Sequence, residues 1–261
     1  WRTAQTITLS AIDDAVDEPD PHAGQVTFDG ESADAAYDQA AITPLDVTIA
    51  DNDEPGVLVT TTDSGNAVTE GGATDSISLR LGTRPTSYVT VTVAGDAQVS
   101  AAPTSVRFAP TDWDTPKEVT LTAVQDQVVE GTHQGNVTFT LDSLDPAYAA
   151  GTASTPATQP VTITDDDTAG ITVVQSDGTT KVEEGGATDT YTVVLSGQPT
   201  ADVRIAIGGG GQVTTSPEAL SFTAADWNVA QTVTVTAIED SIDEPNPHPG
   251  EITHTATTTA A

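Results

Sequence analysis

The sequence predicts an all-β chain of tandem, immunoglobulin-like antiparallel β-sandwiches, with about 112–114 residues in each repeat. Three observations lead to this prediction. A tryptophan-led segment occurs three times, a glycine-containing segment returns at the same spacing, and short stretches throughout the 261 residues alternate between apolar and polar side chains. A period of this length corresponds to a whole domain, because the units of solenoid proteins repeat every 20–50 residues.

The tryptophan segment sets the register of the repeat. Each copy runs from a tryptophan through alternating threonine and apolar residues to an aspartate, and the copies cover residues 1–14, 113–126 and 227–240. The segment Glu-Gly-Gly-Ala-Thr-Asp at 70–75 returns 114 residues later at 184–189. We therefore expect a complete repeat at 55–168, the C-terminal part of an earlier repeat at 1–54, and the N-terminal part of a third repeat, without its closing strand, at 169–261.

Period-two alternation marks the strands of the complete repeat, and no segment keeps apolar residues at helical spacing over three turns. Short strands separated by Gly, Pro and Asp clusters are typical of a sandwich. The expected strands are 57–61, 67–70, 75–81, 88–93, 105–108, 118–124, 136–141 and 160–164.

The aromatic residues recur with the repeat and suggest structural roles. Trp1, Trp113 and Trp227 occupy one position, where we expect a side chain that packs in the core or closes one end of the sandwich. Tyr37 and Tyr148 also occupy one position, and we expect each to hold a loop through its hydroxyl group.

The charge balance restricts the possible partners. Thirty-nine acidic residues against seven basic ones give a net charge of −32, which repels phosphate backbones and anionic membranes. We therefore expect no nucleic-acid binding, and because no stretch approaches 18 apolar residues we expect no membrane insertion in this segment. A charge of this sign attracts cations. The alternative explanation is a generally acidic surface, as in a salt-adapted protein.

The acidic residues cluster in three elements that repeat. One is the glutamate that ends the opening strand, one is the loop after the tryptophan strand with its Asp-x-x-x-Glu spacing, and one is an aspartate-rich tract at the end of the repeat. Two unit charges about 4 Å apart repel by about 4 kcal/mol at an effective dielectric constant near 20. Such clusters favour a bound cation, and Ca²⁺ fits best because it accepts 6–8 oxygen ligands with loose geometry. Zinc prefers Cys or His, and the chain has no Cys. Solvated turns without an ion are the alternative.

These elements resemble the Calx-β domain. The resemblance is carried by Val-Thr-Glu-Gly-Gly at 68–72, by the Asp126-x-x-x-Glu130 loop, and by the Thr-Ile-Thr-Asp-Asp-Asp ending at 162–167. It implies that the opening glutamate, the acidic loop and the aspartate tract meet at one end of the sandwich and bind Ca²⁺. The residues implicated are Glu70, Asp126, Glu130, Asp165, Asp166 and Asp167 in the complete repeat, Asp13, Asp14, Asp17, Glu18, Asp51 and Asp53 in the first, and Glu184, Glu239, Asp240, Asp243 and Glu244 in the third.

Two features of the loops depart from this pattern. The middle repeat has Gln125 and Val129 where the other repeats carry acids, so its site should be weaker or bind fewer ions. His22, His133 and His248 follow the three loops. A histidine before a strand is more often a packing or hydrogen-bonding residue than a metal ligand or pH sensor, and we expect the former here.

No catalytic constellation is visible, because the chain has no Cys, no nucleophile elbow, no phosphate loop and no HExxH motif. We therefore expect a non-enzymatic calcium-binding stalk or spacer of a large extracellular adhesin or surface filament, located outside the cell or on its surface. Ca²⁺ would rigidify the junctions between repeats. The partners would be neighbouring repeats, with other copies in a filament and strand donation between subunits left open. The alternative function is a ligand-binding module for a polysaccharide or a protein.

Overall fold

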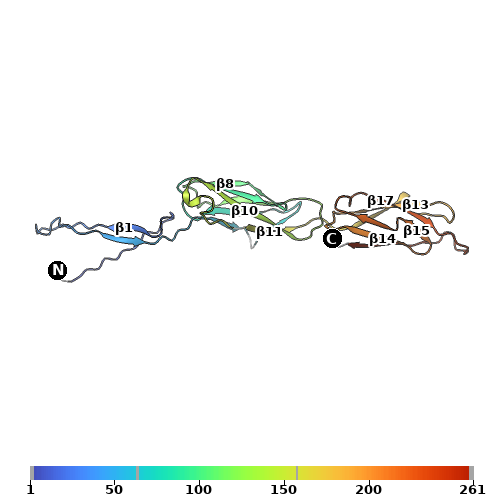
Figure 1. Ribbon diagram of the computed structural model, residues 1–261, viewed down its shortest axis with the longest axis horizontal. Helices are drawn as coiled ribbons and strands as arrows, with labels where there is room; N and C mark the ends of the chain where they lie inside the picture. The colour runs from blue at the N-terminus through green and yellow to red at the C-terminus, as the bar shows by residue number, and fades with distance from the viewer. Residues whose placement is uncertain (1–2, 63–64, 157, 259–261) are drawn as a thin grey trace. The chain divides into compact units, whose positions relative to one another are not determined.

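The computed structural model describes residues 3–62, 65–156 and 158–258 (Figure 1). Within these ranges the chain forms eighteen β-strands and two short 3-10 helices, with no α-helix, so the all-β prediction is confirmed. None of the described helical segments has the length and apolar character needed to cross a membrane. The chain divides into two compact units, which comprise residues 1–68, 73–124 and 134–162, and residues 69–72, 125–133 and 163–261.

Two sheets, antiparallel apart from the neighbouring strands β4 and β11, dominate the first unit. One has the strand order β3-β5-β9-β7 and the other β4-β11-β10-β6-β8. The bounds are β3 Val57–Thr61, β4 Ala67–Thr69, β5 Asp75–Leu81, β6 Val89–Gly95, β7 Val99–Ala102, β8 Ser105–Phe108, β9 Lys117–Ala123, β10 His133–Ser143 and β11 Thr158–Thr164. The end of β4, the start of β10 and the end of β11 belong to the second unit.

The core of these sheets follows from the alternation in the sequence. Successive residues of a strand point to opposite faces, so every second side chain of β5 and β6 is buried. Ile77, Leu79 and Leu81 of β5 are completely buried, as are Val89 and Val91 of β6. Threonine and serine occupy most of the positions between them and face outward.

The eight strands expected at 57–164 are present, and one further strand was missed. Strand β7 has the sequence Val-Ser-Ala-Ala, and it pairs with β9 so that Val99 lies opposite Ala123. Its buried side chains belong to Val99 and Ala101, and alanine is too small to give a clear alternation signal. The missed strand completes the sheet that carries the acidic loop after β9.

A second pair of antiparallel sheets forms most of the second unit. The strand orders are β12-β13-β17-β15 and β16-β14-β18. The bounds are β12 Ile171–Gln175, β13 Asp189–Leu195, β14 Val203–Gly209, β15 Val213–Ser216, β16 Ala219–Phe222, β17 Gln231–Ala237 and β18 Ile252–Thr258. Their core includes Tyr191, Ile205, Phe222 and Trp227.

The tryptophan prediction is confirmed for Trp227, which is buried in this core. Trp113 is only partly buried, and Trp1 lies outside the described residues. The two described tryptophans have equivalent backbone partners one repeat apart. The carbonyl oxygen of Trp113 accepts from the N–H of Leu81, and that of Trp227 accepts from the N–H of Leu195. The tryptophan position therefore fixes the end of the β5 and β13 strands.

Residues 3–54 form a smaller structure within the first unit. Strands β1 (His22–Val26) and β2 (Leu45–Ile49) make a two-stranded antiparallel sheet. Large apolar side chains before β1, among them Ile7 and Ile12, are exposed. The boundaries of the three expected repeats stay a prediction.

Tyr148 fastens a loop to the sandwich, as its recurring position predicts. It ends a 3-10 helix (Pro146–Tyr148) whose first turn is capped by Asp145, and its side chain is completely buried. The hydroxyl group donates to the carbonyl oxygen of Thr83 at 2.8 Å and accepts from the backbone N–H of Thr83 at 3.0 Å. Tyr37, at the equivalent position, is 69% exposed.

Replacing Tyr148 by phenylalanine should therefore destabilise the first unit, because the polar groups of Thr83 lose buried partners. A free-energy cost of about 1–3 kcal/mol is expected. Chemical denaturation of the two variants Tyr148→Phe and Tyr37→Phe measures it, with the exposed Tyr37 as the matched control. Equal losses in both variants would contradict the assigned role.

Candidate metal centre

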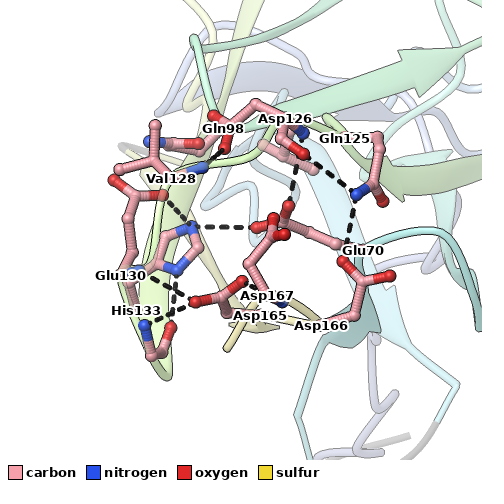
Figure 2. Close-up of polar contacts among 12 residues, drawn as sticks. Glu70, Gln98, Gln125, Asp126, Val128, Glu130, His133, Asp165, Asp166 and Asp167 are labelled. Atoms are coloured by element: carbon pink, nitrogen blue, oxygen red, sulfur yellow. Dashed lines mark hydrogen bonds and ion pairs between the residues drawn. The ribbon is translucent and has the colours of Figure 1, made fainter. Parts of the chain in front are cut away.

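Three segments of the second unit bring the predicted acidic residues of the complete repeat together (Figure 2). Glu70 follows β4, the loop at 125–132 connects β9 to β10, and the tract at 165–167 follows β11. Strands β4 and β11 are neighbours in their sheet and run in the same direction, because the N–H of Thr162 donates to Asn66 and the N–H of Glu70 to Thr164, so their C-terminal ends lie at one edge. The backbone N–H of Glu70 donates to the carbonyl oxygen of Thr164 at 3.0 Å, so the opening glutamate and the aspartate tract start from adjacent points.

Glu70 is the most deeply buried acid of this cluster. Its side chain is only 1% exposed. The Oε2 atom accepts a long hydrogen bond of 3.4 Å from the backbone N–H of Asp126, whereas Oε1 has no hydrogen-bond partner. Burial raises the pKa of Glu70, and the neighbouring charges of Asp126 and Asp165 raise it further. The environment therefore disfavours the ionised form unless positive charge is supplied.

Asp165 has the opposite environment. Its Oδ1 atom accepts from the backbone N–H of Asp167, and its Oδ2 atom accepts from the N–H groups of Glu130 and Gly131, all at 2.8 Å. These hydrogen bonds, with that from Asp167 the largest contribution, hold the pKa of Asp165 below its ordinary value. Asp165 thus stays ionised and ties the acidic loop to the end of β11.

Asp166 is held by Gln125, the residue that replaces an acid in this repeat. The side-chain amide of Gln125 donates to Asp166 Oδ1 at 3.0 Å and to the carbonyl oxygen of Asp126 at 3.1 Å. Gly71 allows this approach: its φ is +59°, and a Cβ atom there would lie 2.9 Å from Gln125 Oε1. The substitution therefore removes one negative charge and adds a donor that orients another carboxylate.

Asp167 completes the cluster. Its Oδ2 atom is buried and has no hydrogen-bond partner. Burial raises its pKa, and the charges of Asp165, Asp166 and Asp126 add to the effect. One oxygen atom each from Glu70 and the three aspartates lies within 4.8 Å of the others. Two oxygens on opposite sides of a Ca²⁺ ion are separated by at most about 5 Å, so the residues present fit this ion.

The acidic loop of the first repeat has the same connection to its tract. Asp51 Oδ2 accepts from the backbone N–H of Glu18 at 2.8 Å, and this hydrogen bond is the main cause of the lowered pKa of Asp51. The pKa of Asp53 is raised by burial and then by four neighbouring charges. The four charges that raise the pKa of Asp53 belong to Asp51, Asp13, Asp14 and Asp17, all of which are in the sequence-predicted set.

The third repeat brings together part of its predicted set. Glu184 and Glu244 lie with His248 in a group whose ligand atoms are within 4.8 Å of one another. Glu239 approaches the turn at Gly185, where a Cβ atom would lie 2.9 Å from its Oε2. Asp240 caps the N–H of Ile242 at 2.7 Å, and Asp243 is exposed. Of the five predicted residues, Glu184 and Glu244 are therefore the pair that shares a candidate site.

The loop at 125–132 also makes backbone contacts that the sequence did not reveal. The N–H of Gln198 donates to the carbonyl oxygen of Gln127 at 2.7 Å, and the N–H of Val129 donates to the carbonyl oxygen of Gln198 at 2.9 Å. Gln198 lies in the turn between β13 and β14 of the same unit. The first unit has a similar contact. The backbone N–H of Arg84, which lies in the corresponding turn, donates to the carbonyl oxygen of Ala15 in the preceding acidic loop at 2.7 Å.

No protein-family model matches the sequence, and no curated protein matches it. Among solved structures the chain is similar to the "Crystal structure of Apo-form Calx CBD1 domain", with 13% identity, a TM-score of 0.31, and coverage of 43% of this chain and 99% of that one. It is also similar to the "Crystal structure of calcium binding domain CBD12 of CALX1.1", with 14% identity, a TM-score of 0.30, and coverage of 78% and 82%. The "Crystal structure of the S-layer protein SbsC domains 4 and 5" matches with 18% identity, a TM-score of 0.24, and coverage of 47% and 58%. These similarities are too weak to assign a function.

The raised pKa of Glu70 gives a pH-dependent prediction for protein in excess chelator. A carboxyl group whose pKa is raised by folding stabilises the fold below its ordinary pKa, and this contribution is lost as pH rises through the raised value. Glu70→Gln, which cannot ionise, should therefore raise the melting temperature at pH 7 and have little effect near pH 4. Thermal unfolding at both pH values measures this. A lower melting temperature of Glu70→Gln at pH 7 would contradict it.

Proposed function

We propose that this chain is a non-enzymatic, calcium-binding structural segment in which Ca²⁺ occupies the cluster of Glu70, Asp165, Asp166 and Asp167. The observation that carries the proposal is the environment of Glu70. Its carboxylate is almost completely buried among three other acids, and one of its oxygens has no hydrogen-bond partner. Burial of an uncompensated charge is costly, and a cation removes that cost.

The chemistry of the donors supports Ca²⁺ over Mg²⁺. The oxygens come from a turn and from three consecutive residues after a strand, and they all lie within 4.8 Å of one another. Mg²⁺ requires near-ideal octahedral geometry at about 2.0–2.1 Å, whereas Ca²⁺ accepts irregular sets of oxygen ligands at about 2.3–2.6 Å. A loose and strongly anionic set of this kind favours the larger ion.

The position of the acidic loop supports a structural role. In the second unit the loop is hydrogen-bonded on one side to Asp165 and on the other to the turn at Gln198. An ion bound beside Asp165 would restrain the loop and, through it, that turn. The corresponding contact of Arg84 with Ala15 repeats the arrangement in the first unit. We infer that Ca²⁺ stiffens the junctions between repeats, as a stalk or spacer of an extracellular adhesin or surface filament requires.

The alternative function, a ligand-binding module, depends on exposed aromatic residues that differ between repeats. Tyr88 and Tyr191 are tyrosines that do not recur at the repeat spacing, so they are the candidates for such a surface. Tyr191 is 3% exposed and its hydroxyl group lies 2.9 Å from His254 Nε2, so it belongs to the core. Tyr88 is exposed, but the guanidinium group of Arg107 lies 3.7 Å above its ring and covers one face. These positions favour the structural role.

Calcium should stabilise the protein through the cluster. At 100 times its dissociation constant a bound ion adds about 2.7 kcal/mol to the free energy of unfolding. The double variant Asp166→Asn with Asp167→Asn should lose this gain, because two of the ligands lose their charge. Thermal unfolding with Ca²⁺ and with excess chelator measures it. Glu118→Gln, an exposed acid of β9, is the control and should keep the gain; an unchanged gain in the double variant would refute the site.

The structural role predicts an effect of calcium on the flexibility of the whole chain. Small-angle X-ray scattering of the 261-residue protein should give a narrower distribution of interatomic distances with Ca²⁺ than with chelator. The double variant should give the chelator profile under both conditions. Identical profiles for wild type, measured where the melting temperature shows that Ca²⁺ is bound, would refute the stiffening role and leave calcium binding intact.

A further inference from the structure

Each of the three acidic loops is followed by a histidine whose Nε2 atom faces a glutamate of that loop. The distance from Nε2 to the glutamate Oε2 is 3.2 Å for His22 and Glu18, 3.5 Å for His133 and Glu130, and 3.0 Å for His248 and Glu244. The remaining histidine, His254, contacts the hydroxyl group of Tyr191 instead. The pairing of histidine with glutamate is therefore a property of the acidic loops.

A second carboxylate completes the group in the middle repeat. Glu70 Oε1 lies 4.0 Å from His133 Nε2, and Figure 2 shows Glu70 and Glu130 on either side of the imidazole ring. One atom from each of Glu70, Glu130 and His133 lies within 4.8 Å of the others. Glu184, Glu244 and His248 form the same combination of residue types in the third repeat.

The other ring nitrogen of the histidine is held by the backbone. His133 Nδ1 lies 2.9 Å from the carbonyl oxygen of Gly131, and His248 Nδ1 lies 3.2 Å from that of Pro245. A carbonyl oxygen can only accept, so Nδ1 carries the proton and donates. In the neutral ring this leaves the lone pair of Nε2 directed at the carboxylates. Metal-binding histidines have this arrangement, in which the second nitrogen donates to a carbonyl or carboxylate group.

Two buried atoms of this group, one on Glu70 and one on His133, have no hydrogen-bond partner. Glu70 is about 99% buried, and its Oε1 atom, which faces His133, has no hydrogen-bond partner. His133 Nε2 is buried and also has none. A lone pair and two anionic oxygens that face one another repel, and a cation between them removes the repulsion.

We propose that Glu70, Glu130 and His133 form a binding site for a divalent transition metal, with Zn²⁺ as the best-fitting ion, and that Glu184, Glu244 and His248 form a second copy of it. Imidazole nitrogen is a good ligand for zinc and a poor one for Ca²⁺, which binds through oxygen. The nitrogen–oxygen separations of 3.5 and 4.0 Å exceed the roughly 3.4 Å between two ligands of a tetrahedral zinc ion, and the three ligand atoms lie within 4.8 Å of one another, so side-chain rotations must bring them closer when the ion binds. Three protein ligands leave one position for water.

This site is chemically different from the all-oxygen calcium cluster, although Glu70 belongs to both. Asp165, Asp166 and Asp167 are the remaining ligands of the calcium set, whereas Glu130 and His133 are the remaining ligands of the zinc set. Because Glu70 is common, binding of one metal changes the affinity for the other. The proposal does not require the calcium site to be filled.

Isothermal titration of the full chain with Zn²⁺, in calcium-free buffer at pH 7.5, tests the site. His133→Gln should remove one tight equivalent of Zn²⁺, and His133→Gln with His248→Gln should remove two. His254→Gln is the matched control, because it deletes the histidine outside the acidic loops, and it should bind as wild type does. Titration with Co²⁺ should give visible absorption bands of a tetrahedral nitrogen-containing site, which are weaker in His133→Gln and absent in the double histidine variant.

The calcium-dependent rise in melting temperature separates this proposal from the preceding one. His133→Gln should retain that rise, which also shows that the variant is folded. Full zinc stoichiometry in the double histidine variant would show that carboxylates alone bind the metal and would overturn the proposal. Absence of zinc binding to wild type, with NMR spectra of the imidazole nitrogens unchanged by Zn²⁺, would show that the group does not bind the metal and would also overturn the proposal.

Discussion

Electrostatic repulsion among carboxylates at the end of β4 and β11 is the constraint around which this chain is organised. Glu70 is buried beside Asp165, Asp166 and Asp167, and the backbone and Gln125 neutralise only part of their charge. Asp165 receives three N–H groups, while Glu70 Oε1 and Asp167 Oδ2 receive none. Burial, together with the neighbouring charges, therefore raises the pKa values of Glu70 and Asp167. The proposed Ca²⁺ ion would resolve this imbalance.

The same loop serves both the acidic cluster and the backbone contacts beyond it. The nine residues 125–133 contain the backbone N–H groups that donate to Asp165 and the imidazole ring of His133. They also make the backbone hydrogen bonds to the turn at Gln198. In the first unit Glu18 is tied to Asp51, and Ala15 contacts Arg84 in the corresponding turn. These contacts recur about one repeat apart. An ion that orders one acidic loop would therefore also restrain the turn to which that loop is hydrogen-bonded, and the same holds for the loop of the next repeat. A stalk built this way would derive its stiffness from its acidic residues.

Much of the fold could be predicted because burial in a strand leaves a period of two. Ile77, Leu79 and Leu81 alternate with polar residues, and the strand they predict is the strand that forms. Strand β7 was not predicted from the sequence, because a buried residue as small as Ala101 gives no clear apolar signal that separates a strand from a turn. The repeat spacing identified the acidic elements, but it could not show that the carboxylate of Asp165 accepts hydrogen bonds from three backbone N–H groups. That assignment depends on where the loop passes, which alternation does not encode.

The histidines show a second limit of sequence reasoning. Their recurrence at His22, His133 and His248 was visible, yet a loop histidine next to acids is compatible with simple hydrogen bonding. The orientation of the ring supplies what the sequence lacks, since Nδ1 of His133 lies beside the carbonyl oxygen of Gly131 and Nε2 is directed at two carboxylates. Only the spatial approach of Glu70, which is 63 residues away in the sequence, reveals the group as a possible ligand set.

A crystal structure of the protein grown with Ca²⁺, with anomalous diffraction data, tests the central claim most directly. The account predicts an anomalous peak among Glu70, Asp165, Asp166 and Asp167, with carboxylate oxygens about 2.3–2.6 Å from the ion. Carboxylates turned outward into solvent, with no anomalous peak at saturating Ca²⁺, would contradict it.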